Sequence, residues 1–182
     1  MARIGIAAGH TRRTDGERLY EHQRCHMAAE VVADLARMAG HEVVVVPEQV
    51  YDLTNDASLR RRVQLFNHAA TDYNIELHLN AGGGSYSTTI FFPGSEEGEY
   101  LATDIEDAVH LVCPWKSIGQ QDQTYFDRNL HFLMSTRAPS VIVEPGFKDN
   151  VMHREWMDSD RFAPEYAAAV FVGIASYGLT QG

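Results

Sequence analysis

Three polar residues stand within or next to apolar segments that are predicted to be β-strands. His10 follows the segment 2–8 (ARIGIAA), His78 lies within 75–79, and Glu144 ends the segment 140–144 (SVIVE). Parallel strands end at one edge of a sheet, where ligands usually bind, so we expect these three side chains to converge there. Imidazole and carboxylate groups at such an edge indicate metal binding or proton transfer.

The alternation of side chains along a strand extends this polar group. Glu76, His78 and Asn80 alternate with Leu77 and Leu79, so the three polar residues are predicted to share one face. A polar stripe inside an apolar strand costs free energy unless its members have partners. Asn80 is therefore a candidate contact for a substrate or for the groups around His78.

A zinc site would complete this arrangement. Catalytic zinc takes three protein ligands and leaves the fourth position to water, and two histidines with one carboxylate are a common set. With His10 and His78 as the histidines, the candidates for the third ligand are Asp15, Glu17, Glu21, His22 and His26. We favour Glu21 because it lies at the start of the first predicted helix, near the strand end that carries His10. Glu17 and His22 remain the nearest alternatives.

A separate metal pair within that helix is an alternative that the sequence does not favour. His22 and His26 are spaced i, i+4, yet the segment lacks the glutamate of an HExxH motif. We interpret both as surface histidines.

Strands and helices must alternate along the chain to position these residues. The predicted strands are 2–8, a buried strand 41–46 (HEVVVV), 75–79, 88–92 and 140–144. The predicted helices are 19–38, 58–71 with Ser58 as its cap, 95–112 with Ser95 as its cap, 151–157 and 164–177. Residues 113–128 show no period and are expected to form a loop that could bind a ligand. The alternation predicts a single α/β domain over residues 1–182, with a mixed, mostly parallel sheet flanked by helices.

Composition excludes several classes of protein. The net charge of -10 argues against a nucleic-acid partner, and the basic run 60–62 is interpreted as a solvated helix face. No segment approaches the ~18 uninterrupted apolar residues of a membrane span. Cys25 and Cys113 form no CxxC pair and are predicted to be buried free thiols. We expect a monomer.

Several motifs together resemble a known enzyme family. The segments AGHTRRTDG (8–16), LRRRVQLFNHAATDYNIELHLNAGGG (59–84) and APSVIVEPGFKDN (138–150), with Glu21 between the first two, are similar in order and spacing to the zinc-dependent N-acetylmuramoyl-L-alanine amidases of the Amidase_3 family. The resemblance covers essentially the whole chain. It implies that His10, Glu21 and His78 bind zinc and that Glu144 is the catalytic acid/base.

The resemblance also implies a substrate and a mechanism. The substrate would be peptidoglycan, cut at the amide between N-acetylmuramic acid and L-alanine. Zinc would lower the pKa of a water molecule while Glu144 moves its proton to the departing amine. The alternatives are a zinc peptidase that cuts within the stem or cross-bridge peptides, and a wall-binding module that has lost catalysis.

The expected place of action is the cell wall, although the N-terminus shows no export signal. A phage-type lysin, made in the host cytoplasm and released through a lesion formed by another protein, reconciles the two. A chain from which a signal peptide or a wall-binding domain has been removed would look the same.

Overall fold

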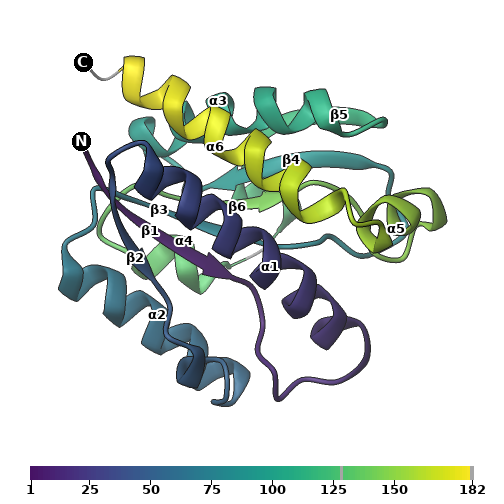
Figure 1. Ribbon diagram of the computed structural model, residues 1–182, viewed down its shortest axis with the longest axis horizontal. Helices are drawn as coiled ribbons and strands as arrows, with labels where there is room; N and C mark the ends of the chain where they lie inside the picture. The colour runs from purple at the N-terminus through teal and green to yellow at the C-terminus, as the bar shows by residue number, and fades with distance from the viewer. Residues whose placement is uncertain (128, 181–182) are drawn as a thin grey trace.

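Six strands form one sheet in the order β2-β1-β3-β6-β4-β5 (Figure 1). This computed structural model describes residues 1–127 and 129–180. The strands are β1 (Arg3–Ala8), β2 (Glu42–Val45), β3 (Tyr73–Leu77), β4 (Tyr86–Phe91), β5 (Lys116–Asp122) and β6 (Ser140–Glu144). β2, β1, β3 and β6 run parallel to one another, whereas β4 pairs antiparallel with β6 and parallel with β5. The predicted mixed, mostly parallel sheet is confirmed.

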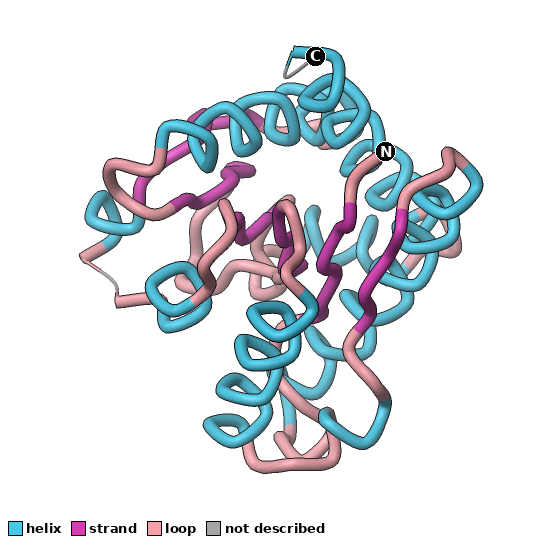
Figure 2. The backbone as a smooth tube through the Cα atoms, turned by 90° about the vertical axis from the view of Figure 1, so that its left-hand side faces the viewer, coloured by secondary structure: helices cyan, strands magenta, loops and turns pink. Residues whose placement is uncertain are grey.

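Helices cover both faces of this sheet (Figure 2). They are α1 (Gly16–Met38), α2 (Asn55–Ala69), α3 (Glu96–Val112), α4 (His131–Ser135), α5 (Val151–Asp158) and α6 (Phe162–Thr180), with short 3-10 turns η1 (Glu48–Val50) and η2 (Gln123–Phe126). Neighbouring residues of a strand point to opposite faces. In β3, Tyr73 contacts Tyr177 of α6, whereas Glu76 contacts Arg62 of α2, so these two helices lie on opposite faces. α6 packs against α1 and α3 on its face, and α4 contacts α2 on the other.

Several boundaries follow from local chemistry that the sequence shows directly. Ser95 caps α3 as predicted, because its side chain accepts a hydrogen bond of 3.1 Å from the Gly98 amide. β6 has the predicted bounds, and Cys25 and Cys113 are buried free thiols as expected.

Three predictions about the elements are wrong. The strand predicted as buried, β2, lies at the edge of the sheet, where Val45 is 40% exposed. Ser58 does not cap α2, which already begins at Asn55, and its side chain is buried inside the helix. Residues 116–126 of the predicted loop form β5 and η2, while residue 128 lies outside the described residues. In each case a short segment is compatible with more than one position or structure, and its contacts with the rest of the fold determine which one it adopts.

α6 has the length and composition of a membrane span over Phe162–Leu179. Half of that window is buried within the structure, where it packs against α1 and α3. α6 lies close against α3 at Gly173, where a Cβ atom would lie 2.4 Å from the Cα of Ile105. Because only a glycine fits at this contact, we interpret α6 as a helix of the protein core.

The beginning of β1 and the end of α6 lie at the same edge of the sheet. β1 starts at its amino edge, and Tyr177 near the end of α6 stacks edge-on, at 5.3 Å between ring centroids, on Tyr73, the first residue of β3. Figure 1 shows the beginning of β1 and the end of α6 close together, away from the point of the β1 arrow. The carboxyl edge, where the polar residues gather, is therefore opposite the beginning of β1 and the end of α6.

Candidate active site

The loop after β1 brings His10 to the carboxyl edge in an unusual backbone conformation. His10 has a φ of 56°, in the left-handed region that non-glycine residues rarely adopt. The preceding Gly9 has no room for a side chain, because a Cβ atom there would lie 2.2 Å from Cε1 of the His78 ring. The Gly-His pair thus allows the two imidazoles to approach, with ring centroids 5.3 Å apart.

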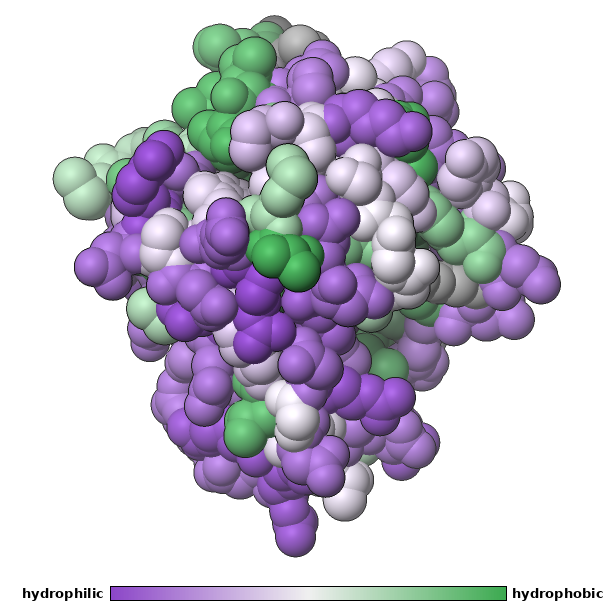
Figure 3. All heavy atoms as spheres, turned by 90° about the vertical axis from the view of Figure 1, so that its right-hand side faces the viewer, coloured by the Kyte–Doolittle hydropathy of each residue, from purple (hydrophilic) through white to green (hydrophobic). Residues whose placement is uncertain are grey.

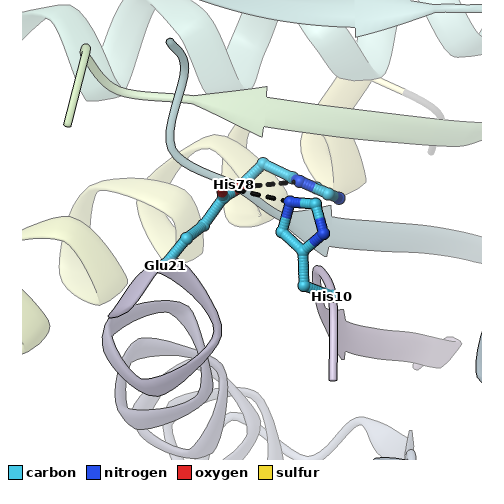
Figure 4. Close-up of side chains that lie close together, drawn as sticks. All are labelled: His10, Glu21 and His78. Carbon is cyan, nitrogen blue, oxygen red and sulfur yellow. Dashed lines mark hydrogen bonds and ion pairs between the residues drawn. The ribbon is translucent and has the colours of Figure 1, made fainter. Parts of the chain in front are cut away.

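Glu21, in the second turn of α1, lies between these two histidines (Figure 4). Its Oε2 is 3.1 Å from His10 Nε2 and its Oε1 is 2.9 Å from His78 Nδ1. Oε1 also accepts the Leu79 amide at 3.0 Å, and the Lys148 ammonium contacts Oε2. Burial would raise the pKa of Glu21, but the hydrogen bonds with His10 and His78 outweigh it and hold this pKa well below its ordinary value.

His78 is held from both sides of its ring. It follows β3 directly instead of lying inside a strand, which corrects the predicted position by one residue. Its Nε2 is 3.0 Å from Oε2 of Glu76, which in turn pairs with Arg62 of α2. Burial would lower the pKa of His78, but the hydrogen bonds with Glu21 and Glu76 raise it to about 10.

Arg62 corrects the interpretation of the basic run 60–62. Arg60 and Arg61 are exposed as expected, but Arg62 is only 2% exposed and reaches under the site. The solvated face therefore comprises the first two arginines only.

Glu144 and Asn80 line the same cavity, of about 410 Å³, as the two histidines and Glu21. Glu144 is the last residue of β6 and is 5% exposed. Asn80 accepts a hydrogen bond of 2.8 Å from the Ala81 amide through its Oδ1, which fixes the orientation of the side chain. The face of the molecule towards which β1 points is mostly hydrophilic (Figure 3). A polar, hydrated ligand suits such a surface.

The segment after Glu144 is fixed by several buried contacts. The Pro145 carbonyl accepts hydrogen bonds from Trp115 Nε1 at 2.7 Å and from Cys113 Sγ at 3.3 Å. His153 Nδ1 accepts the Phe147 amide at 2.9 Å, and its ring stacks on Trp115 with centroids 3.6 Å apart. These contacts hold the end of β6 against the cavity.

The sequence matches the N-acetylmuramoyl-L-alanine amidase family over residues 4–176. The chain belongs to this family. A curated relative, the N-acetylmuramoyl-L-alanine amidase CwlM of Bacillus licheniformis, is 28% identical over 178 residues, which cover 96% of the chain and 68% of the relative.

Solved structures agree with the fold of the amidase. An N-acetylmuramoyl-L-alanine amidase from Clostridium difficile 630 superposes with a TM-score of 0.85 at 20% identity, covering 100% of the chain and 98% of that structure. The catalytic domain of the CD27L endolysin, which targets Clostridia difficile, has a TM-score of 0.77 at 26% identity, covering 97% of the chain and 98% of that domain.

The alternatives to Glu21 are engaged elsewhere in the amidase. Glu17 is an exposed residue that pairs with Arg154 at 3.0 Å. His22, predicted to be a surface residue, is 2% exposed, because its Nδ1 bonds to the Gly9 carbonyl at 3.0 Å under the loop that carries His10. Burial lowers the pKa of His22 to about 4.

A second group of potential metal ligands lies away from the cavity of the amidase. The side chains of His26, Glu30 and Glu48 approach one another within 4.8 Å. Glu30 and Glu48 are exposed, and Arg12 pairs with Glu48. We interpret this group as a surface ion-pair network.

Sequence reasoning missed two cations next to the site of the amidase. Arg62 could have been found from helical phase, since Val63 and Phe66 of the same helix are also buried. Lys148 carries no such signal, because it lies in the loop after β6 and meets Glu21 only through the tertiary fold.

Proposed function

We propose that this amidase is a zinc enzyme that hydrolyses the amide between N-acetylmuramic acid and L-alanine of peptidoglycan. The proposal is carried by one observation: two imidazole nitrogens and a carboxylate oxygen, from His10, Glu21 and His78, lie within 4.8 Å of one another in the cavity that Glu144 also lines. This donor set fits catalytic zinc, and the cavity leaves room for a water molecule and a substrate. When bound, zinc supplies the Lewis acidity that makes water nucleophilic near neutral pH and polarises a carbonyl group.

Glu144 is the acid/base of the proposed reaction. Water adds to the amide carbonyl carbon, which belongs to the lactyl group of N-acetylmuramic acid. Glu144 accepts the proton that this addition releases. The same carboxyl group then donates the proton to the amide nitrogen as the C–N bond breaks. The products are a lactyl carboxylate and a stem peptide with a free L-alanine amine.

Two other residues support these steps. Asn80, oriented by the hydrogen bond from the Ala81 amide to its Oδ1, would contact the substrate through its amide group. Lys148 forms an ion pair with the buried carboxylate of Glu21 and so adds a positive charge beside it.

Mass analysis of digested cell wall, together with zinc analysis of the protein, tests the proposal. The wild-type protein should hold one zinc ion per chain and release intact stem peptides with a free L-alanine amine. His78→Ala should lose both the metal and the activity, whereas substitution of exposed Glu155 by Ala should change neither. Cuts within the peptide would indicate a zinc peptidase instead, and binding to the wall without turnover would indicate a binding module.

A further inference from the structure

A buried ion pair lies behind His78, on the side of the ring away from Glu21. Glu76 of β3 and Arg62 of α2 are each 2% exposed, and the guanidinium contacts the carboxylate at 2.5 Å. Burying such a pair is expensive, and apolar residues of similar volume often serve stability as well or better. The pair therefore calls for an explanation other than packing.

The Arg62–Glu76 pair connects the end of β1 with the ring of His78, which follows β3. Arg62 Nη1 donates to the Ala8 carbonyl, the last residue of β1, at 2.6 Å and to Oε1 of Glu76. The other oxygen of Glu76, Oε2, is 3.0 Å from His78 Nε2. His78 Nδ1 points the other way, to Glu21 at 2.9 Å. Each carboxylate oxygen of Glu76 thus has one fixed partner.

We propose that Glu76, oriented by Arg62, is a positioning residue that keeps Nε2 of His78 protonated when the ring binds the metal, so that Nδ1 offers its lone pair to the metal. This inference rests on the proposed zinc site. A neutral imidazole has one N–H group and one lone pair, and the hydrogen bond made by one nitrogen decides the role of the other. A carboxylate can only accept here, so Nε2 must donate. Replacing a carboxylate that hydrogen-bonds a metal-binding histidine commonly weakens metal binding by about 10- to 100-fold.

The geometry gives a sharp prediction for Glu76→Gln. An amide has one acceptor oxygen and one donor nitrogen, and Arg62 accepts nothing, so the oxygen must turn to Arg62. The amide NH₂ group then faces His78 Nε2 and favours the tautomer with its proton on Nδ1, which cannot bind metal. In the double variant Glu76→Gln/Arg62→Met the amide is free to turn its oxygen to His78. The double variant should therefore bind zinc more tightly than the single variant.

Zinc dissociation constants, measured by competition with a chelator on metal-stripped and reloaded protein, test this inference. Glu76→Gln should weaken zinc binding by about 10- to 100-fold, and adding Arg62→Met should restore part of the loss. The control is Glu106→Gln, which changes another buried carboxyl group: Glu106 lies on α3 and accepts hydrogen bonds from the hydroxyl groups of Ser87 and Thr89 on β4 and of Ser117 on β5. It should keep the wild-type affinity. Unchanged affinity in Glu76→Gln, or a double variant no tighter than the single one, overturns the inference.

Nitrogen-15 NMR of the His78 ring in zinc-loaded wild-type protein needs no variant to fold. The inference requires a protonated Nε2 and a metal-bound Nδ1, and the reverse assignment overturns it. Failure of the proposed function is distinguishable, because wild-type protein would then hold no zinc at the outset.

Discussion

Glu21 lies between two imidazole rings and an ammonium group, with its carboxylate almost fully buried. An anion in such a place is stable only when positive charge or hydrogen-bond donors surround it. Here His10, His78, Lys148 and the Leu79 amide all face it. A zinc ion would supply positive charge at the same point, so Glu21 stays ionised with or without the metal.

Substitution of Glu144 separates metal binding from catalysis. Because Glu144 is not one of the three clustered donors, Glu144→Ala should retain zinc, whereas the loss of the acid/base should lower kcat by about 10²- to 10⁴-fold. Zinc content and the rate of release of stem peptides measure the two effects. Full turnover in Glu144→Ala would contradict the proposed role.

The sequence predicts the residues of the site to different degrees. His10 and Glu144 can be predicted because His10 closely follows an apolar strand and Glu144 ends one, and the alternation that begins in β3 already places Glu76 on the same side as His78. Glu21 depends on the length of the loop before α1. Lys148 cannot be predicted, because only the packing of the last loop on α1 brings it to Glu21.

At the scale of elements, the crossing of α6 over α3 depends on Gly173. A Cβ atom at this position would lie 2.4 Å and 2.8 Å from backbone atoms of Ile105 and Asp104, so the helices would have to separate. Gly173→Ala should lower the free energy of unfolding by about 1–3 kcal/mol. Denaturation by urea, with the midpoint and slope compared to wild type, measures this.

Gly178 offers a matched control in the same helix. A Cβ atom there meets nothing within 4 Å, so Gly178→Ala should be neutral or stabilise the protein by up to about 1 kcal/mol. Equal losses in the two variants would show that the close crossing at Gly173 is not the source of the effect.

The contacts of His153 make the loop after β6 sensitive to acid. Burial lowers the pKa of His153 to about 4, from an ordinary value of 6.5. Below pH 6.5, His153 is protonated in the unfolded chain but stays neutral in the folded chain. The free energy of unfolding therefore decreases as the pH falls from 6.5 towards 4. Thermal unfolding should show that His153→Asn, whose Oδ1 can still accept the Phe147 amide, has a smaller loss of Tm between pH 7 and pH 5.

Substitution of the exposed His110 is the control for this measurement. His110→Asn should leave the dependence of Tm on pH as it is in the wild type. If both variants retain the wild-type acid sensitivity, His153 is not its source.

The elements that the sequence fails to predict share a physical cause. β5 (KSIGQQD) has no apolar alternation, because it is an edge strand paired only with β4. α4 has five residues, too few for a helical period to emerge. The elements predicted well, such as α1, α3 and β6, bury an apolar face or are wholly buried, which leaves a pattern in the sequence.

At the scale of the whole molecule, metal binding and folding should be coupled only partly. The large buried core exists independently of the site, so a chelator should lower Tm without unfolding the protein. Free zinc at about 100 times its dissociation constant would add about 2.7 kcal/mol, or roughly 5–10 °C in Tm for a chain of this length. Calorimetry with and without zinc measures the shift, and His78→Ala should show none.

The beginning of β1 and the end of α6 share one edge of the sheet, and the cavity lies at the other. A bead, a surface or another polypeptide attached next to the beginning of β1 or the end of α6 would therefore leave the cavity facing away from the point of attachment. An insoluble wall polymer cannot diffuse into a buried pocket. An enzyme that acts on such a polymer needs its active site on a surface that the polymer can contact. In the described part of the chain, the cavity lies on the side opposite the beginning of β1 and the end of α6.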